Sequence, residues 1–260
     1  MAERQWSTVR ADDRGWLGLL TLHRPERMNA LTPTLIREFG EASRSLVEAG
    51  AKVVVITGSD RAFCVGADLF EVAAISGTEE FYIWTTAIQE QFASLESLGA
   101  ITIAAIDGYC MGGGLELAMR CDYRLAAHTA CLALPEIKHG LLPTGGGLTA
   151  LVELIGLSQA KDLVLSGRTV TAPEAVAVGL VHQLVESPAA ESAITWAERF
   201  RDHPRLALRA AKQAFRLTRT GTPPGWSEAM EALTACLLVS GDEAKEGIAA
   251  FLEKREARFA

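Results

Sequence analysis

Two glutamates and a glycine triplet make the stretch from Ile106 to Glu136 the part of this sequence best suited to chemistry. Gly112-Gly113-Gly114 separates a hydrophobic run from a segment of helical composition, so the triplet is expected at a helix N-terminus. Unpaired N–H groups in the first turn of a helix can bind a negatively charged oxygen, and glycine lets a ligand come close to the backbone. Glu116 lies in the same helix, and Glu136 follows a second strand candidate, Ala130–Leu134. Two carboxylates and a set of donors could therefore converge on one ligand.

Each of these features also has a purely structural interpretation. A glycine triplet is often only a tight turn, and a glutamate near a helix N-terminus complements the helix dipole. A second segment favours the chemical interpretation. Val53–Gly58 is expected to be a buried strand, and it leads through a polar turn to the motif Ala62–Leu69.

The elements that would position these residues alternate between strand and helix. The expected elements are a hairpin of Ser7–Arg10 and Trp16–Leu22 around the turn Asp12–Gly15, a helix from Pro33 to about Gly50 capped by Thr32, a parallel strand Val53–Thr57, an amphipathic helix Thr78–Leu98 and a strand Ile101–Ile106. The apolar stripe of the Thr78–Leu98 helix, which includes Phe81 and Trp84, could be core packing alone. This alternation predicts an α/β fold with a substantial parallel component.

Beyond Gly147 the pattern becomes mainly helical. Helices are expected at Leu148–Ile155 and Ser158–Ser166, a capping box at Thr171–Glu174, a short strand at Gly179–Val185 and three or four helices from Ala189 onward, the last opened by an S-x-x-E box at Ser240–Glu243. The predicted boundary is soft and lies near residue 200. Residues 1–200 would form the α/β core and residues 201–260 a helical C-terminal region.

Composition places the chain among ordinary globular proteins. Its 260 residues are 49% hydrophobic and 22% charged, which is enough for one sizeable core and an appendage. The net charge of −7 argues against nucleic acid or an anionic membrane surface as the main partner. The N-terminus lacks the apolar segment of a signal peptide, and the five cysteines form no CxxC pair, so a cytoplasmic protein with reduced thiols is expected. Cys64 and Cys110 are interpreted as small buried hydrophobic residues.

Five motifs in order resemble signatures of the enoyl-CoA hydratase/isomerase family, the crotonase superfamily. They are RPERMNAL at 24–31, VITG…AFCVGADL at 55–69, DGYCMGGGLELAMRCD at 107–122, LPEIKHGLLPTGGG at 134–147 and EGIAAFLEKREARF at 246–259. The resemblance spans nearly the whole chain. It implies a spiral of ββα turns with a helical C-terminal trimerisation region, a homotrimer or homohexamer, an acyl-CoA thioester as partner, and neither a metal nor a cofactor, because coenzyme A is part of the substrate.

The chemistry implied by the resemblance is the addition of water to an enoyl-CoA. Negative charge then develops on the thioester oxygen, so donors fixed at that position should provide the largest catalytic gain. By motif position these donors are the N–H groups of Ala67 and Gly113. Glu116 and Glu136 match the hydratase glutamates, Glu116 positioning and deprotonating the water and Glu136 handling the Cα proton.

The resemblance also implies a binding surface for coenzyme A. Its residues by motif are Arg24, Arg27, Met28, Ala30, Ala67, Asp68, Leu69, Gly112, Gly113, Phe251 and Lys254. Arg24, Arg27 and Lys254 could equally be solvated surface cations. Two positions depart from the family pattern: Phe70 stands where a basic residue is common, and Gly99-Ala100 replaces a common proline. The acyl pocket falls in segments 70–95 and 141–144, where the family varies, so the sequence does not specify the acyl group.

Three functions are compared. The favoured one is an enoyl-CoA hydratase, which could also run as a dehydratase in carnitinyl-CoA or aromatic acyl-CoA metabolism. The alternative enzyme performs another CoA-thioester reaction on the same scaffold: isomerisation, C–C cleavage or thioester hydrolysis. The third is a CoA-binding assembly subunit without turnover. The retained pair Glu116 and Glu136 disfavours this last function, since an inert scaffold needs no such pair.

Overall fold

The computed structural model describes residues 6–218 and 226–259. The strands are β1 (Val9–Asp13), β2 (Leu17–Leu22), β3 (Val53–Thr57), β4 (Ala62–Cys64), β5 (Ile101–Ile106), β6 (Tyr109–Met111), β7 (Tyr123–Ala127), β8 (Cys131–Ala133), β9 (Val170–Thr171) and β10 (Gln183–Val185). The helices are η1 (Pro25–Arg27), α1 (Pro33–Ala49), α2 (Leu69–Ala74), α3 (Thr78–Ser97), α4 (Gly113–Arg120), η2 (Glu136–His139), α5 (Gly147–Ser166), α6 (Ala172–Ala177), α7 (Ala189–Ala197), η3 (Glu198–Phe200), α8 (Arg205–Thr218), α9 (Trp226–Val239) and α10 (Asp242–Glu253).

The described strands form two sheets, between which the chain passes repeatedly. One sheet has the order β1-β2-β3-β5-β7-β10 and the other β4-β6-β8-β9. Each of the pairs β3/β4, β5/β6 and β7/β8 places its first strand in the larger sheet and its second in the smaller one. Equivalent strands of successive turns pair in parallel. The expected spiral of ββα turns is therefore present, although the alternation of strands and helices alone did not predict it.

The N-terminal hairpin is confirmed, with a longer first strand than expected. β1 and β2 pair antiparallel from Val9 with Leu22 to Asp13 with Gly18. The turn starts later because the Asp13 carboxylate accepts a hydrogen bond from the N–H of Gly15 at 2.9 Å, and Asp12 and Asp13 stay in the ladder. This local bond is typical of a turn that begins at an aspartate.

Helix α1 forms as its end signals predict. The Thr32 hydroxyl accepts a hydrogen bond from the N–H of Leu35, Pro33 opens the first turn, and Gly50 lies at the C-cap with φ 120°. Phe39 is among the buried residues on the face that packs against the sheet. In α3 the predicted stripe is divided, since Ile88, Phe92 and Leu95 are buried while Phe81 and Trp84 are not fully covered.

The two predicted helices together form α5, which is kinked at Gly156, whose φ of 77° and ψ of 160° are not helical. The capping interaction of Thr171 with the N–H of Glu174 is also present, at the start of α6. The strand expected at Gly179–Val185 is shorter than predicted. Leu180 and Val181 donate their N–H groups to Ala175 at the end of α6, so pairing with β7 begins at Gln183.

The capping box at Ser240 is wrong. Gly241 is the N-cap of α10 and no side chain caps this helix, because the Ser240 hydroxyl donates to the carbonyl of Leu237 in the last turn of α9. The serine of the S-x-x-E pattern therefore bonds to the end of α9 and does not cap the start of α10. No helix in the described ranges has the length and apolar character needed to cross a membrane.

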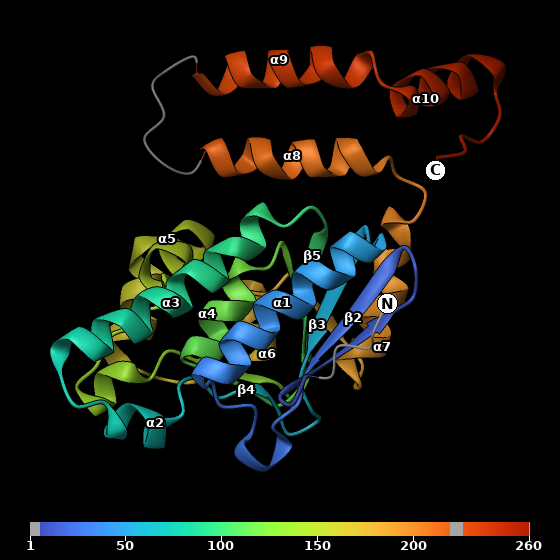
Figure 1. Ribbon diagram of the computed structural model, residues 1–260. Coiled ribbons are helices and arrows are strands. Elements are labelled where there is room, and N and C mark those ends of the chain that lie inside the picture. The colour runs from blue at the N-terminus through green and yellow to red at the C-terminus, as the bar shows by residue number, and fades with distance from the viewer. Residues whose placement is uncertain (1–5, 219–225, 260) are drawn as a thin grey trace.

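The three C-terminal helices lie together on one side of the α/β core (Figure 1). α8 packs on α3 and β5, α9 on α8, and α10 on α9. Lys212 of α8 fixes this arrangement, since its amine is buried and donates to the carboxylate of Asp122 at 2.7 Å and to the carbonyl of Ala100 at 2.9 Å. Large apolar side chains on these helices remain exposed in the single chain: Leu206, Phe215, Leu233, Leu237, Val239, Ile248, Phe251 and Leu252.

Candidate active site

Glu116 is held inside the protein by its place on α4. The helix starts at Gly113, and Gly112 precedes it with φ 53°, a conformation that favours glycine. Because α4 packs against both α3 and α5, its residues from Gly114 to Met119 are buried. Glu116 is 3% exposed. A carboxylate is rarely placed so deep unless it is hydrogen-bonded.

The hydrogen bonds to Glu116 come from the glycine-rich turn before α5. Oε1 accepts the N–H of Gly147 at 2.8 Å. Burial raises the pKa of Glu116 above its usual range, and the N–H groups of Gly145 and Gly147, with the charge of Arg120, oppose that shift. A Cβ on Gly147 would lie 2.5 Å from Oε1, and one on Gly145 would lie 2.9 Å from Oε2. Both glycines therefore make room for the carboxylate.

Glu136 lines the same cavity as Glu116. It begins η2, and in the described part of the chain its Oε2 is buried without a hydrogen-bond partner. Burial, together with the charge of Glu116, raises the pKa of Glu136 to about 7, against a hydrogen bond from its own backbone N–H. A Cβ on Gly112 would lie 3.1 Å from Oε1. Two carboxyl groups with raised pKa values in one site are suited to general acid and base catalysis.

The backbone N–H groups of Ala67 and Gly113 lie near the two glutamates, on the wall of the same cavity. Within residues 6–218 and 226–259, those of Ala67 and Gly113 donate to no other group. They are close together, because a Cβ on Gly113 would lie 3.8 Å from the nitrogen of Ala67. Gly66, with φ 88°, makes this approach possible, since a Cβ there would lie 2.9 Å from the nitrogen of Gly113. Leu31 holds the segment by accepting from Asp68 and donating to Gly66.

These groups line one cavity of about 720 Å³. Of the residues predicted to bind substrate, the following lie on its wall: Arg27, Met28, Ala30, Ala67, Asp68, Leu69, Gly112, Gly113, Glu116 and Glu136. Another part of the wall is apolar and comes from the two segments named for the acyl pocket: Phe70, Val72, Phe81, Trp84, Ile88, Leu141 and Leu142. Phe81 and Trp84 of α3 therefore face this cavity.

Arg24 does not line the cavity. Its guanidinium donates to the carbonyl of Ala30 at 2.6 Å and to the carboxylate of Asp68 at 3.2 Å. Asn29, which sequence reasoning did not select, supports the same loop: its Oδ1 accepts the N–H of Arg24, and its Nδ2 donates to Ala62 and Phe63. The only sequence signal for a role of Asn29 was that it lies in the RPERMNAL motif. These contacts join the loop after β2 to β4.

Arg27 and Phe70 form a cationic and aromatic pair at the cavity wall. The guanidinium carbon lies 5.0 Å from the ring centroid, within the usual range of a cation–π contact. Phe70 is 75% exposed. At the position where the family pattern has a basic residue, this chain therefore presents an aromatic ring with Arg27 over it.

Phe251 and Lys254 lie away from the cavity in the same chain. α10 contacts α9 and stands on the far side of the C-terminal helices from the core (Figure 1). Phe251 is 81% exposed, and Lys254 is the C-cap of α10 with φ 54°. The structure does not bring these two residues together with the other predicted binding residues.

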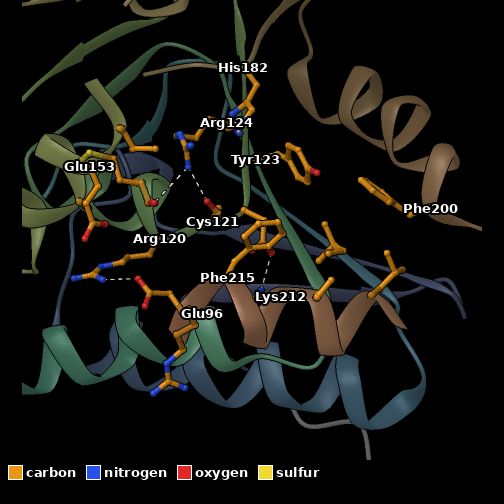
Figure 2. A pocket seen from close by; sticks show the side chains of 18 residues that line it. Glu96, Arg120, Cys121, Tyr123, Arg124, Glu153, His182, Phe200, Lys212 and Phe215 are labelled. Carbon is orange, nitrogen blue, oxygen red and sulfur yellow. Dashed lines mark hydrogen bonds and ion pairs between the residues drawn. The ribbon is translucent and has the colours of Figure 1, made fainter. Parts of the chain in front are cut away.

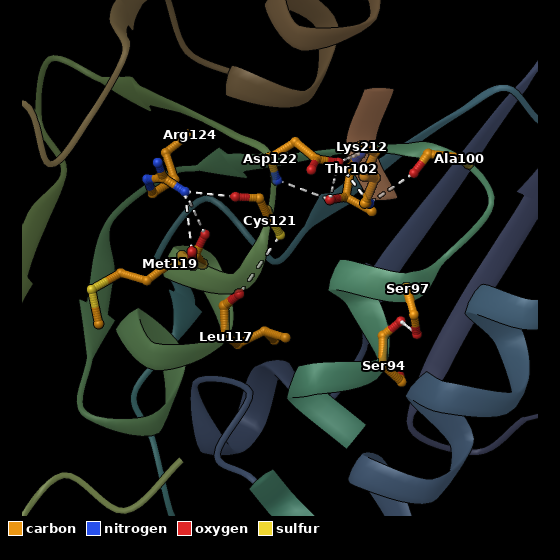
Figure 3. A network of polar contacts seen from close by, with 11 residues as sticks. Ser94, Ser97, Ala100, Thr102, Leu117, Met119, Cys121, Asp122, Arg124 and Lys212 are labelled. Atoms are coloured by element: carbon orange, nitrogen blue, oxygen red, sulfur yellow. Dashed lines mark hydrogen bonds and ion pairs between the residues drawn. The ribbon is translucent and has the colours of Figure 1, made fainter. Parts of the chain in front are cut away.

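The end of α4 is anchored by a polar network (Figure 3). Arg124 is 2% exposed, and its guanidinium donates to the carbonyls of Leu180, Cys121, Ala118 and Met119. These last three carbonyls terminate α4, so a buried cation replaces the missing helical partners. Cys64 and Cys110 are fully buried, and burial raises the pKa of the Cys64 thiol to about 12, as expected of inert thiols.

Comparison with known proteins gives consistent results. A sequence profile of the family described as enoyl-CoA hydratase/isomerase matches residues 14–260. The chain is 35% identical to the probable enoyl-CoA hydratase echA8 of Mycobacterium leprae, over 98% of each chain. It is 36% identical to the 2,3-dehydroadipyl-CoA hydratase of Escherichia coli, over 93% of this chain and 94% of that protein.

Solved structures agree with the sequence comparison. The enoyl-CoA hydratase from Bacillus anthracis superimposes with a TM-score of 0.90 at 32% identity, covering 97% of this chain and 99% of the other. Pseudomonas aeruginosa DspI gives a TM-score of 0.93 at 30% identity, covering 100% and 99%. The chain therefore belongs to the enoyl-CoA hydratase/isomerase family, the crotonase superfamily, and its activity class is that of an enoyl-CoA hydratase.

Proposed function

We propose that this protein adds water across the α,β double bond of an enoyl-CoA thioester, or removes it, with Ala67, Gly113, Glu116 and Glu136 as its catalytic groups. The observation that carries the proposal is that two N–H groups without a partner in the described residues, the buried carboxyl group of Glu116 and the half-buried carboxyl group of Glu136 line one cavity. The N–H pair supplies what a thioester oxygen needs as it gains negative charge. The carboxyl pair supplies a base and an acid.

The roles of the two glutamates follow from their surroundings. Glu116 accepts a fixed N–H bond from Gly147, which favours its ionised form and suits it to orient and deprotonate water. Glu136, with a pKa raised to about 7 and one unpartnered oxygen, is suited to deliver a proton to Cα and to recover it in the reverse direction. Because the two groups interact, they titrate as a coupled pair.

Substrate binding is proposed along the two walls of the cavity. The apolar wall, which includes Phe81, Trp84 and Leu142, would take the acyl group. Arg27, beside the exposed ring of Phe70, would take the coenzyme A end, since it offers a cation to phosphate and an aromatic face to a base. Arg24 would act indirectly by holding Asp68 and Ala30.

No metal and no cofactor beyond the coenzyme A of the substrate is proposed for this reaction. Hydration transfers protons and stabilises one developing charge, and the four groups named above can do both. A cytoplasmic location stays a prediction of the sequence.

A trimer, or a hexamer of two trimers, is proposed as the working assembly. The exposed apolar side chains of α8, α9 and α10 form a surface that a second copy of the chain would cover. Phe251 and Lys254 could then approach coenzyme A bound to a neighbouring copy, since they lie away from the cavity of their own chain.

The test of the catalytic proposal uses Glu116→Gln and Glu136→Gln. Each variant should lower kcat for hydration of a short trans-2-enoyl-CoA by about 10²–10⁴-fold, because each removes one proton-transfer group. Binding of the saturated acyl-CoA should remain close to wild type, since neither substitution changes the size of the side chain appreciably. Glu71→Gln, on an exposed residue of α2 outside the cavity wall, is the matched control and should leave kcat unchanged. A Glu116→Gln or Glu136→Gln variant with more than about a tenth of the wild-type kcat would remove that residue from the mechanism.

A further inference from the structure

Arg120 lies one helical turn after Glu116 on α4, and both side chains reach the same peptide group. Glu116 accepts the N–H of Gly147 at 2.8 Å, and Arg120 directs Nη2 to the carbonyl of Gly146 at 3.4 Å. The Gly146 carbonyl and the Gly147 N–H belong to one trans peptide and point in opposite directions. An acid and a base on one helix therefore contact the two ends of the peptide that bears the Glu116 hydrogen bond, and the Gly146 carbonyl also accepts the N–H of Ala150 at 3.2 Å.

Arg120 is itself fixed from a third element. Its Nη1 donates to the carboxylate of Glu96 on α3 at 2.5 Å, and both side chains are largely buried, with 15% and 17% exposed. Figure 2 shows the two side chains directed toward one another at the wall of a second cavity, of about 760 Å³. Charge-assisted bonds between partly desolvated groups are stronger than surface ion pairs. The position of Arg120 is therefore set by α3.

Gly146 shows how tightly the guanidinium fits. A Cβ at this position would lie 1.8 Å from Nη2 of Arg120, and the residue has φ 88°. All three glycines of Gly145–Gly147 thus admit a charged side chain of α4, two for Glu116 and one for Arg120. The second glycine triplet of the sequence therefore leaves the space that the side chains of Glu116 and Arg120 occupy.

We propose that Arg120 is a positioning residue for Glu116, acting through the Gly146–Gly147 peptide, and that Glu96 holds Arg120 in place for this task. The inference rests on the proposed role of Glu116 as the base that activates water. Arg120 does not line the active-site cavity and touches no reacting atom. It acts by fixing the direction of the Gly147 N–H and by placing a positive charge behind the carboxylate.

The charged and titratable groups around Glu116 come from several elements. Glu26 and Arg27 of η1, Asp68, and Glu136 and His139 of η2 line its cavity. Arg120 follows it on α4, Glu96 of α3 pairs with Arg120, and Glu153 of α5 lines the second cavity with Arg120. Arg120 is the charge that lowers the pKa of Glu116 against the effect of burial. Its removal should therefore raise that pKa, so that ionised Glu116 is lost at a higher pH when the solution is acidified.

The experiment compares Arg120→Met, Arg120→Lys and Glu96→Gln in the full-length protein, with hydration of a short trans-2-enoyl-CoA followed from pH 5 to 9. Arg120→Met should lower kcat by about 10–100-fold, as expected for a misplaced reacting group, with KM changed less than about threefold. The acid limb of kcat/KM should move to higher pH. Arg120→Lys should keep the limb near its wild-type position but still lower kcat, because lysine keeps the charge and lacks the fork that spans Glu96 and Gly146.

Controls separate this proposal from damage to the fold and from failure of the proposed function. Arg168→Met, which removes the ion pairs with Asp162 and Glu174 outside the cavity wall, should change neither kcat nor the pH profile. An Arg120→Met protein with kcat within twofold of wild type would overturn the inference, and so would a lower kcat with an unmoved acid limb. Should Arg120→Met fail to fold, Glu96→Gln and Arg120→Lys decide, and wild-type kcat in both overturns it. Full activity in Glu116→Gln would instead refute the proposed function, whatever Arg120 does.

Discussion

A carboxyl group whose pKa lies near 7 affects the stability of the folded protein as well as its chemistry. Glu136 titrates near 4.3 in an unfolded chain, and burial raises its folded pKa to about 7. A raised folded pKa contributes stability that is complete below the unfolded pKa and is lost as pH rises through the folded pKa. The ionised form at pH 8 is therefore a cost to the fold.

Glu136→Gln should reveal this cost. The variant cannot ionise at position 136, so its Tm relative to wild type should rise between pH 5 and pH 8. Thermal unfolding at the two pH values measures the change in the difference. A Tm difference that is the same at both values would show that Glu136 is already ionised at pH 5 in the folded protein.

At the residue scale, sequence reasoning selected the groups proposed to react but not the groups that hold them. Glu116, Glu136 and Gly113 stand in motifs whose residue types suggest their chemistry, and the structure places them on one cavity. The supporting pair of Arg120 and Glu96 left no such signal. Its members lie on separate helices, and the sequence does not show which helices pack together.

At the element scale, the site depends on how closely the turn before α5 approaches α4. Gly147, the first residue of α5 after this turn, carries the N–H that Glu116 accepts, and a Cβ there would lie 2.5 Å from Oε1 of the carboxylate. Sequence analysis identified the motif LPTGGG but could not say what its glycines face, because Gly147 and Glu116 are brought together by packing of α5 on α4.

Gly147→Ala should therefore reduce catalysis through displacement of Glu116. The added Cβ would lie 2.5 Å from Oε1 and 2.7 Å from Cγ, so the carboxylate has to move. A kcat lower by about 100-fold is expected, the loss typical of a reacting group misplaced by about 1 Å. Gly77→Ala, where a Cβ meets nothing within 4 Å, is the matched control for adding a methyl group. Equal kcat values for the two variants would show that the turn adjusts without moving Glu116.

At the scale of the whole molecule, the core and the C-terminal helices differ in how well sequence predicted them. The hairpin, the parallel strands and α1 carry local signals of period, cap and turn, and they were found with errors at their ends. The spiral order of the two sheets has no local sequence signal, and it was predicted only from the family resemblance. The helical C-terminal trimerisation region was likewise implied by the resemblance, and large apolar side chains of α8, α9 and α10 are exposed in the single chain.

Assembly is the prediction that belongs to this scale. Light scattering at micromolar concentration should give three or six times the chain mass of 27.9 kDa. Leu237→Glu should lower the mass, because Leu237 is 75% exposed on α9 and its burial between copies would become unfavourable. Leu165→Glu on α5, where the leucine is 69% exposed, is the matched control and should leave the mass unchanged. A mass near 27.9 kDa with full activity would show that one copy is sufficient.

The N–H groups of Ala67 and Gly113 belong to the main chain, and this determines how the site responds to genetic change. No missense codon other than one for proline deletes a main-chain N–H, whereas any codon can alter the apolar wall made by Phe81, Trp84 and Leu142. Inherited variation can therefore reshape the space beside the two donors while leaving the donors in place. Their direct removal requires a change in the polymer itself, such as an ester in place of the amide at position 67 or 113, introduced by chemical synthesis.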